Sequence, residues 1–316
     1  MHIVISDDHQ DCIRSLACFD KLKVHTVEIF NDSVSDVDAL AQRYQNADAI
    51  VLIRERTAIT KELLDRLPKL KLISQTGKMA SHVDLQACKD RGIVVMDGRG
   101  SGSATAELNM LLILASLRRL VEEVARLKNG QWQGYLGDQL AGKVLGVYGF
   151  GRIGRQVCYL GKAFGAKPLV WGRDSTLQKA AQEGFALASS KEEFFRTSDI
   201  VCLQLRLNDA TRHIVGPQDL AMMKPTSLLV NASRAELIAP GALEAGLKQG
   251  RPAYAAIDTY ESEPVLGADH PLLHLSNCLC TPHIGFVERD NYEAYFGIAF
   301  DNINSYLAGS PQNCVN

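Results

Sequence analysis

The chain alternates short apolar runs with stretches in which apolar residues recur every three or four positions. In the first third, the apolar runs predict strands, and the periodic stretches predict helices over Lys61–Leu67 and Val83–Asp90. The strands predicted in this part are His2–Ser6, Ala49–Ile53, Leu70–Gln75 and Ile93–Met96. Strands that alternate with helices predict a parallel sheet with helices on both faces.

A glycine-rich segment follows this first series. The run Asp97–Ser103 contains three glycines in seven residues, which predicts a joint between two domains. One long helix is then predicted from about Thr105 to Lys128, and Gly130 follows its last turn. Its first half, Ala106–Leu117, is apolar nearly all round, so we expect both sides to be buried, one of them against a second subunit.

A second alternating series begins at Lys143. Its predicted strands are Val144–Tyr148, Pro168–Trp171, Ile200–Leu205, Ser227–Asn231, Ala255–Asp258 and Cys278–Thr281. A last helix is predicted over about Glu288–Leu307, and it could return to the first domain. The whole pattern predicts an α/β protein with two doubly wound parallel-sheet domains.

Length and composition agree with this organisation. The 316 residues exceed what one hydrophobic core usually serves, and 46% hydrophobic with 22% charged residues is ordinary globular usage. A net charge of -2 provides no general field for nucleic acid or anionic lipid. The N-terminus lacks the pattern of a signal peptide, and the apolar run Leu108–Leu117 is too short to span a bilayer. We therefore expect a cytoplasmic protein with neither a nucleic-acid nor a membrane partner.

The eight cysteines are scattered and form no CxxC pair, so we expect reduced thiols. One group near the C-terminus could instead indicate zinc: His270, His274, Cys278, Cys280 and His283. Its spacing meets no standard zinc pattern. Because alternate residues of a strand face the same side, we expect Cys278 and Cys280 to pack in a core, and we expect no metal site.

The second series opens with a glycine motif. The predicted strand Val144–Tyr148 runs into Gly149-x-Gly151-x-x-Gly154, and a helix is predicted directly afterwards, over Arg155–Phe164. The first glycine permits a tight turn, the second lets the backbone approach a pyrophosphate, and the third allows close packing of helix and strand. The N–H groups at the start of the helix attract phosphates. In this strand–helix setting the motif predicts a dinucleotide site.

The end of the next strand bears on the choice between NAD and NADP. An acid that binds the adenosine ribose is expected here, and Asp174 lies twenty residues beyond Gly154, as NAD would require. However, Gly172 leaves room at the strand end, and Arg173 is a planar donor suited to a 2′-phosphate. We favour NADP, with NAD as the alternative.

Polar residues follow three later strands, at the sheet edge where open α/β sheets bind their ligands. These segments are Asn231–Arg234, Asp258–Pro264 and Thr281–Gly285. Together with the Arg54-x-Arg56-Thr57 strand end, the Leu67-Pro68 turn and the glycine motif, they resemble the D-isomer-specific 2-hydroxyacid dehydrogenases over nearly the whole chain. This family includes glyoxylate/hydroxypyruvate reductases, D-lactate dehydrogenases and phosphoglycerate dehydrogenases.

The resemblance implies a catalytic set of Arg234, Glu263 and His283. Residue chemistry agrees with it, because arginine can grip the carboxylate and ketone of a 2-oxo acid. Histidine can then protonate the alkoxide formed by hydride transfer, and act as the base in oxidation. A carboxylate beside the ring holds it and favours its protonated form. Glu261 is a weaker candidate than Glu263 for this acid.

The resemblance also implies further contacts. Asp258 matches the aspartate that contacts the nicotinamide amide, and Arg206 falls where the family often has proline near the adenine, so it could help to hold a 2′-phosphate. The implied cofactor-binding residues are Thr105, Gly149, Gly151, Arg152, Ile153, Gly154, Gly172, Arg173, Asp174, Leu205, Arg206, Ala232 and Asp258. The implied substrate-binding residues are Arg54, Gly77, Lys78 and Met79.

Two departures from the family affect the predicted loops. Met79 replaces the second glycine of the substrate loop, so that loop is expected to be stiffer, and Lys78 could add a charge. Ala235, Glu236 and Ala239 replace the usual glycine and aspartate after Arg234, which leaves the shape of that loop open. Arg54 and Arg56 share a face of an extended segment and could meet a second anionic group, such as a phosphate, or form a solvated edge.

We therefore predict a flavodoxin-like substrate-binding domain (1–98 plus 287–316) and a Rossmann NAD(P)-binding domain (99–286). The expected activity is NAD(P)-dependent reduction of a small 2-oxo acid or oxidation of the 2-hydroxy acid. Phosphoglycerate dehydrogenase is the alternative within the family, and a dinucleotide-sensing binding protein is the alternative outside enzymes. The resemblance also implies a homodimer formed through the cofactor domain.

Overall fold

The computed structural model describes all residues from 1 to 316. They form two compact units, one made of Met1–Ser101 with Glu288–Asn316 and the other of Gly102–Val287. The unit boundaries fall a few residues after the predicted position 98 and directly after Val287.

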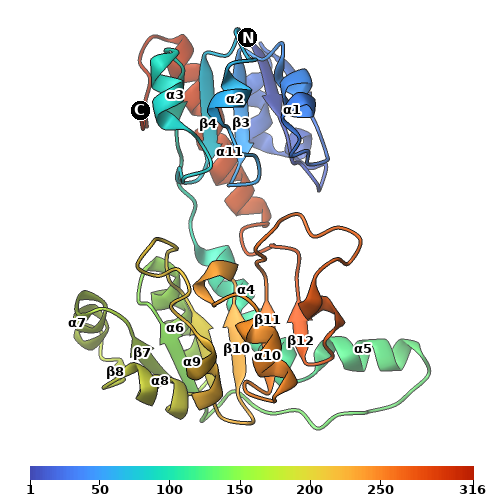
Figure 1. Cartoon of the computed structure of the whole chain (residues 1–316), viewed down its shortest axis with the longest axis vertical. Coiled ribbons are helices and arrows are strands. Elements are labelled where there is room, and N and C mark those ends of the chain that lie inside the picture. Colours follow the sequence, from blue (N-terminus) through green and yellow to red (C-terminus); the bar gives the residue numbers. More distant parts are fainter. The chain divides into compact units, whose positions relative to one another are not determined.

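The first unit contains a five-stranded parallel sheet with the order β2-β1-β3-β4-β5 (Figure 1). Its strands are β1 (His2–Ile5), β2 (Thr26–Ile29), β3 (Ala49–Ile53), β4 (Leu72–Thr76) and β5 (Val94–Met96). This is the strand order of flavodoxin-like sheets, so the predicted fold class is confirmed for this unit. β3 and β4 are buried along their whole length, as expected for central strands covered on both faces.

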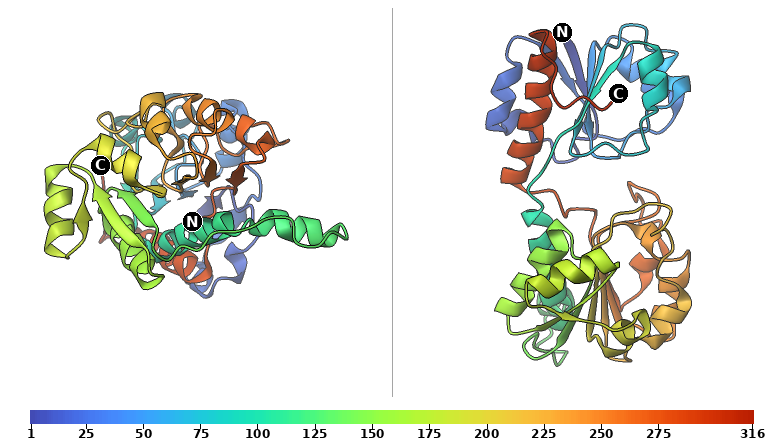
Figure 2. Two further views of the ribbon diagram at one scale, coloured as in Figure 1. Left: turned by 90° about the horizontal axis from the view of Figure 1, so that it is seen from below. Right: turned by 90° about the vertical axis from the view of Figure 1, so that its left-hand side faces the viewer.

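Helices cover both faces of this sheet. On one face α1 (Val37–Tyr44), α2 (Lys61–Leu64) and α3 (Leu85–Asp90) pack against Val4, Ile50 and Ile73 in a single apolar core. The other face carries α11 (Arg289–Leu307), which contacts β4 and the 3-10 helix η2 (Ala17–Leu22). Figure 2 shows α11 and α3 on opposite faces of the sheet. The short 3-10 helix η1 (Ile13–Ser15) precedes η2.

Local signals explain where these helices begin. The side chains of Asp36, Thr60 and Asp84 each accept a backbone N–H from the first turn, which satisfies a donor that the helix itself leaves unpaired. α11 joins the first unit through buried Asn302, whose amide donates to the carbonyl of Asp97 at 3.1 Å and to Ser74 Oγ at 3.3 Å. The last helix therefore belongs to the first sheet.

The second unit contains a seven-stranded parallel sheet with the order β12-β11-β10-β9-β6-β7-β8. Its strands are β6 (Val144–Tyr148), β7 (Lys167–Trp171), β8 (Ala186–Leu187), β9 (Ile200–Leu203), β10 (Leu228–Asn231), β11 (Tyr254–Ile257) and β12 (Cys278–Cys280). The strand order reverses between β6 and β9, as in a Rossmann sheet, and this confirms the fold class predicted for the unit.

The helices of the second unit enclose two apolar cores. α4 (Ser103–Leu117) and α6 (Arg152–Ala163) cover one face, and α8 (Lys191–Thr197), α9 (Pro217–Met222) and α10 (Ala242–Lys248) cover the other. The remaining elements are α7 (Asp174–Gln182), which contacts β7 and β8, and the 3-10 helices η3 (Ala235–Leu237) and η4 (Pro271–His274). No helix of either unit combines the length and apolarity needed to cross a bilayer.

The prediction of one helix over Thr105–Lys128 was wrong. The structure has two helices, α4 and α5 (Leu120–Lys128), separated at Arg118 and Arg119. Arg119 adopts a left-handed backbone (φ 51), and its guanidinium carbon lies 4.5 Å from the ring centroid of Tyr135 and 4.4 Å from that of Tyr254. Aromatic side chains from distant segments therefore hold the break.

Other differences are smaller. β1, α2 and β9 end before the predicted residues Ser6, Leu67 and Leu205, and α6 begins at Arg152 rather than Arg155. The edge strands β2 and β8 and the helix α1 were not predicted. Edge strands keep exposed positions and carry no continuous apolar run, so their sequence signal is weak.

Candidate active site

The turn between β6 and α6 has the shape that a pyrophosphate requires. Gly149 has φ +103, and a Cβ at this position would lie 2.5 Å from the carbonyl oxygen of Gln204. A Cβ on Gly154 would lie 2.2 Å from the carbonyl oxygen of Gly149. A Cβ on Gly151 would meet nothing within 4 Å, so the space beside this residue is open where the second glycine of the motif admits a phosphate. The residues present therefore fit a dinucleotide.

The N-terminal turn of α6 completes this cradle. Gly151 is the N-cap of the twelve-residue helix, and no side chain caps the helix there. Arg152 and Ile153, both predicted as cofactor residues, directly follow the open glycine and are the first two residues of α6. Arg152 is exposed and Ile153 is half-buried. The first-turn N–H groups and the positive end of the helix dipole favour an anion at this position.

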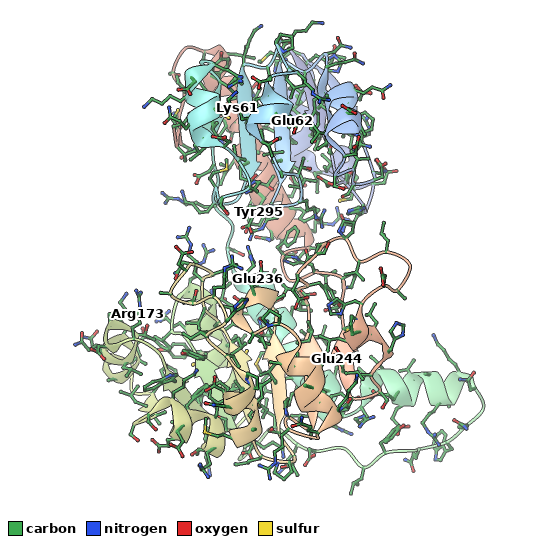
Figure 3. The ribbon with its side chains drawn as sticks, in the orientation of Figure 1. Lys61, Glu62, Arg173, Glu236, Glu244 and Tyr295 are labelled. Atoms are coloured by element: carbon green, nitrogen blue, oxygen red, sulfur yellow. The ribbon has the colours of Figure 1, made fainter.

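The residue after β7 is Gly172, so no acidic side chain is present at this position. A Cβ on Gly172 would lie 2.7 Å from Cγ2 of Thr176, so the chain folds back closely on itself here. Arg173 is the N-cap of α7 and is exposed, and Asp174 is the first residue of that helix (Figure 3). Leu205 and exposed Arg206 follow β9.

The segment after β10 forms a tightly bonded turn around Arg234. The side chain of buried Asn231 accepts the N–H of Ser233 at 3.1 Å and donates to the carbonyl of Arg234 at 2.8 Å. Ser233 Oγ donates to the carbonyl of Leu205 at 2.7 Å, which ties this turn to the segment after β9. Ala232 is buried within the same turn. The backbone that carries Arg234 is therefore fixed by side chains of its own segment.

His283 and Glu263 form a hydrogen-bonded pair in the second unit. His283 Nδ1 lies 2.6 Å from Glu263 Oε2, and the N–H of Tyr260 donates to Glu263 Oε1 at 2.9 Å. Burial alone would raise the pKa of Glu263. The hydrogen bond and charge of His283, the Tyr260 amide and the charge of Arg234 outweigh this and hold the pKa below its ordinary value of 4.5.

This low pKa decides which ring nitrogen of His283 is available. Glu263 is ionised at neutral pH and can only accept hydrogen bonds, so Nδ1 of His283 carries a hydrogen. Nε2 is then the nitrogen that can exchange a proton with a ligand. His283 also has a left-handed backbone (φ 51), a strained conformation that is common at functional sites.

Asp258 occupies the centre of the loop that presents His283. Its carboxylate is fully buried and accepts hydrogen bonds from Thr281 Oγ1 at 2.6 Å and from the N–H groups of Ile284 and Gly285 at 2.8 Å each. Thr105 Oγ1 of α4 donates to the carbonyl of Gly285 at 2.8 Å. Asp258 and Thr105, both predicted as cofactor contacts, thus shape the protein around the site.

The predicted substrate residues lie in the first unit, after β3 and β4. Arg54 has a left-handed backbone (φ 56); its N–H donates to Thr76 Oγ1 at 3.0 Å and its carbonyl accepts from Gln75 Nε2 at 2.6 Å. Its guanidinium lies against Gly77, where a Cβ would be 2.5 Å from Nη1, and donates to the hydroxyl of Tyr295 on α11 at 3.3 Å (Figure 3).

The loop after Gly77 is held by buried Asp97. Lys78 Nζ lies 2.8 Å from Asp97 Oδ1, and the N–H of Met79 donates to Asp97 Oδ2 at 3.2 Å. The Met79 amide is therefore engaged within the unit, and the charge of Lys78 is paired with an acid. Nearby, Arg56 donates to the carbonyl of Asp7 at 2.7 Å.

Sequence reasoning missed several residues that support these side chains. Tyr260 bonds both Glu263 and, through its hydroxyl, the carbonyl of Thr281 at 3.0 Å. Gln75, Asp97 and Tyr295 support Arg54 and the Gly77 loop. Tyr260 lies between Asp258 and Glu263 in the sequence, and this position could have indicated its role. Tyr295 lies more than 200 residues from Arg54, so nothing in the sequence indicated their contact.

The cysteine- and histidine-rich segment near the C-terminus contains two separate side-chain pairs. Cys278 Sγ and Cys280 Sγ lie 3.6 Å apart on one side of β12, and His270 pairs with Glu261 at 3.1 Å. No group of three or more histidine, cysteine, aspartate or glutamate side chains is arranged to bind a metal ion.

A Rossmann sheet with an open phosphate cradle, beside an imidazole–carboxylate pair, defines the chain as a nicotinamide-dinucleotide-dependent oxidoreductase. Comparison with known proteins specifies the class further. Residues 110–285 match the model described as D-isomer specific 2-hydroxyacid dehydrogenase, NAD binding domain. The chain belongs to this family, whose members act on the CH–OH group of 2-hydroxy acids.

Individual proteins that are similar to the chain carry names of the same class of enzyme. The chain is 34% identical over 321 residues to D-3-phosphoglycerate dehydrogenase of Methanocaldococcus jannaschii. The aligned region covers 99% of this chain but only 59% of that protein. It is 34% identical to glyoxylate reductase of Aeropyrum pernix, over 93% of this chain and 90% of the relative. A solved phosphoglycerate oxidoreductase of Vibrio cholerae is 48% identical, with a TM-score of 0.95 over 98% of this chain and 99% of that one.

Substitution of the glycines predicts two separable effects. Gly151→Ala should leave the thermal unfolding midpoint nearly unchanged, because φ is -82 and the added Cβ meets nothing within 4 Å. It should weaken NADH binding at least about tenfold, since the methyl group occupies the space of the pyrophosphate. Gly154→Ala should lose both binding and about 1–3 kcal/mol of stability, because its Cβ collides with the Gly149 carbonyl.

NADH fluorescence titration and thermal unfolding measure these two quantities on the same samples. Gly216→Ala is the matched control, because Gly216 is also a helix N-cap in this unit, has φ -104, and its Cβ would have no neighbour closer than 3.9 Å. Wild-type affinity for NADH in Gly151→Ala would show that the dinucleotide does not approach this turn.

Proposed function

We propose that the chain reduces a small 2-oxo acid to the 2-hydroxy acid, or catalyses the reverse oxidation, with His283 as proton donor and acceptor. The observation that carries this proposal is the 2.6 Å hydrogen bond between His283 Nδ1 and ionised Glu263 at the edge of the dinucleotide-binding sheet. It leaves Nε2 of the ring available to the substrate oxygen.

The three side chains divide the chemistry. Bound nicotinamide supplies or accepts the hydride at C2 of the substrate. Arg234 holds the carboxylate and carbonyl oxygens through its forked donors and stabilises the negative charge that develops on the carbonyl oxygen. In reduction, His283 gives the Nε2 proton to that oxygen, and Glu263 stabilises the ring while it is charged. In oxidation His283 removes the hydroxyl proton instead.

We propose that backbone N–H groups of Gly77 and Lys78 bind the substrate carboxylate. Because the Met79 N–H already donates to Asp97, it contributes least of the backbone N–H groups in this loop. We propose Arg54, whose backbone is fixed by Thr76 and Gln75, as a further substrate contact. An anionic distal group would fit Arg54, and the relatives named for phosphoglycerate keep phosphoglycerate dehydrogenase as the alternative activity.

The domain roles follow from these assignments. We propose that 1–98 with 287–316 bind the substrate and that 99–286 bind the cofactor. All eight cysteines are free thiols, which supports a cytoplasmic location, since reducing compartments keep thiols reduced. The remaining alternative, a dinucleotide-sensing binding protein, would use the same cradle without turnover.

Removal of the proton donor tests the reaction. Steady-state oxidation of NADPH and NADH is followed with glyoxylate, hydroxypyruvate, pyruvate, phenylpyruvate and phosphohydroxypyruvate. His283→Ala should lower kcat about 10²- to 10⁴-fold, the usual contribution of a general acid, while coenzyme affinity is retained. No turnover by the wild type with any of these acids, despite coenzyme binding, would favour the binding protein.

The pairing of Glu263 with His283 predicts how activity and stability depend on pH. Glu263→Gln should move the alkaline limb of kcat/KM for reduction to lower pH, because an uncharged neighbour no longer favours the protonated ring. Since the pKa of Glu263 is lowered by folding, its contribution to stability is fully present above 4.5 and is lost as the pH falls below this value toward the folded pKa. The difference in unfolding midpoint between wild type and Glu263→Gln should therefore shrink in acid, and a constant difference would contradict the pairing.

We further propose that the coenzyme is NADP rather than NAD. Gly172 removes the acid that would repel a 2′-phosphate, and exposed Arg173 and Arg206 are suitable donors. Arg173→Ala should raise KM for NADPH about 10- to 100-fold, because hydrogen bonds to charged groups contribute about 1.5–3 kcal/mol. KM for NADH should change little. Lys179→Ala removes a charge from the same helix as a control, and equal losses with both coenzymes would refute the preference.

A homodimer through the cofactor domain is also proposed. α5 and the segment after it extend away from the sheet of the second unit (Figure 1), and α5 has no buried residue. The exposed apolar side chains gathered here are Leu120, Val121, Val124, Leu127, Trp132, Tyr135 and Leu136. Such an arm is expected to pack on a second copy.

The combined change Val124→Glu and Leu127→Glu should dissociate the dimer, because it places two charges on the apolar side of α5. Light scattering should give twice the chain mass of 34.6 kDa for the wild type and the chain mass for the variant. Leu307→Glu, at a half-exposed leucine of α11, is the matched control and should remain dimeric. A monomeric wild type at micromolar concentration would exclude this interface.

A further inference from the structure

Two thiols meet on the outermost strand of the second sheet. Cys278 Sγ and Cys280 Sγ lie 3.6 Å apart on one side of β12, and Leu279 between them packs on the other side. β12 pairs only with β11, because it lies at the edge of the sheet (Figure 1). Since alternate residues of a strand face the same side, the strand itself holds the two sulfur atoms as neighbours.

The pair combines exposure with a reactive sulfur. Cys278 and Cys280 are both partly exposed. Four of the other six cysteines are buried, namely Cys18, Cys88, Cys158 and Cys202. A hydrogen bond from the Cys278 thiol lowers the pKa of the Cys280 thiol and outweighs burial, which acts in the opposite direction. Because the thiolate is the nucleophilic form, Cys280 is the attacking sulfur, and Cys278 is in contact with whatever Cys280 becomes.

We propose that Cys278 and Cys280 are a modification site, a dithiol that hydrogen peroxide closes reversibly to a disulfide. The Cys280 thiolate attacks one peroxide oxygen, the O–O bond breaks, and the other oxygen takes up a proton and leaves as water, so Cys280 becomes a sulfenic acid. Cys278 then attacks the Cys280 sulfur, the S–O bond breaks, and a second water leaves as the S–S bond forms. The two thiols are thereby oxidised, and the peroxide is reduced to water with the two thiol protons.

Disulfide formation requires β12 to bend. Cα atoms two residues apart on an extended strand are about 6.6 Å apart, and the Cβ atoms that point to the same side are separated by a similar distance. A disulfide brings its Cβ atoms to about 3.5–4.5 Å, so the strand must bend at Leu279. β12 has three residues and a single neighbouring strand, which leaves it room to bend. The resulting strain makes the bond easily reduced, as a reversible modification requires.

The bend is transmitted to the loop that carries His283. Thr281 directly follows Cys280, and its hydroxyl donates to Asp258 at 2.6 Å. The carbonyl of Thr281 accepts the hydroxyl of Tyr260 at 3.0 Å. A bend in β12 therefore strains the bonds that place His283, and oxidation lowers kcat. This effect on kcat rests on the function proposed above, whereas the disulfide itself is measured without turnover.

Peptide mass spectrometry of the full chain tests the modification. The reduced protein is treated with hydrogen peroxide, its remaining thiols are blocked with N-ethylmaleimide, and it is digested with trypsin. The tryptic peptide 249–289 contains both cysteines of the pair and no other cysteine. It should lose the mass of two hydrogens and take up no maleimide, and dithiothreitol should restore both maleimide sites. A peptide that still takes up two maleimides, or that is oxidised in a form that dithiothreitol does not reverse, would overturn the proposal.

Kinetics of three variants test the effect on the reaction. Peroxide should lower the kcat of the wild type about 10- to 100-fold, as expected when catalytic groups are misplaced by about 1 Å, and dithiothreitol should restore it. Cys278→Ala and Cys280→Ala should each keep the activity of the reduced wild type and resist peroxide, because neither can form the disulfide. Cys314→Ala removes an exposed cysteine of the first unit and is the matched control, which should stay sensitive.

The failures of the two proposals are distinguishable. A reduced wild type without turnover would refute the proposed function, while the mass of peptide 249–289 would still decide whether the disulfide forms. A disulfide that forms without any loss of kcat would overturn its coupling to the His283 loop. Equal inactivation of the wild type and of both pair variants, each folded as judged by thermal unfolding, would show that peroxide acts elsewhere.

Discussion

Three hydrogen bonds to the buried carboxylate of Asp258 determine the shape of the candidate active site. They fix Thr281, Ile284 and Gly285, the residues on either side of His283. A left-handed backbone at a residue other than glycine costs on the order of 1–3 kcal/mol, so His283 can keep φ 51 only because its neighbours are held. The same bonds direct the ring toward Glu263 and connect the loop, through Gly285 and Thr105, to α4.

The first unit applies the same principle to Arg54. This residue also has a left-handed backbone, and the two last residues of β4, Gln75 and Thr76, bond its carbonyl and its N–H. In both units, then, a strained residue at the carboxyl edge of a parallel sheet is held by polar side chains of an adjacent strand or loop. Rigid placement of this kind keeps functional groups oriented before a ligand arrives.

Much of this arrangement could be predicted from the sequence. Buried parallel strands are continuous apolar runs, so both sheets were predicted and confirmed. The glycine motif lies between a strand and a helix, which made its turn predictable, and its role as the dinucleotide cradle remains a prediction. The edge strands β2 and β8 were missed because two or four partly exposed residues leave no such run. The break at Arg119 depends on contacts with Tyr135 and Tyr254, which lie well outside the helix, so it has no local signal. The roles of Arg234, Glu263 and His283 remain predictions, supported by the His283–Glu263 bond.

The central claim is that hydride passes between nicotinamide and C2 of a 2-oxo acid while His283 handles the proton. Direct transfer is measured with NADPH deuterated at both C4 positions, followed by mass spectrometry and chiral chromatography of the product. We expect a D-2-hydroxy acid with one deuterium at C2, formed in ordinary water. A product without deuterium, or one of the L configuration, would contradict it.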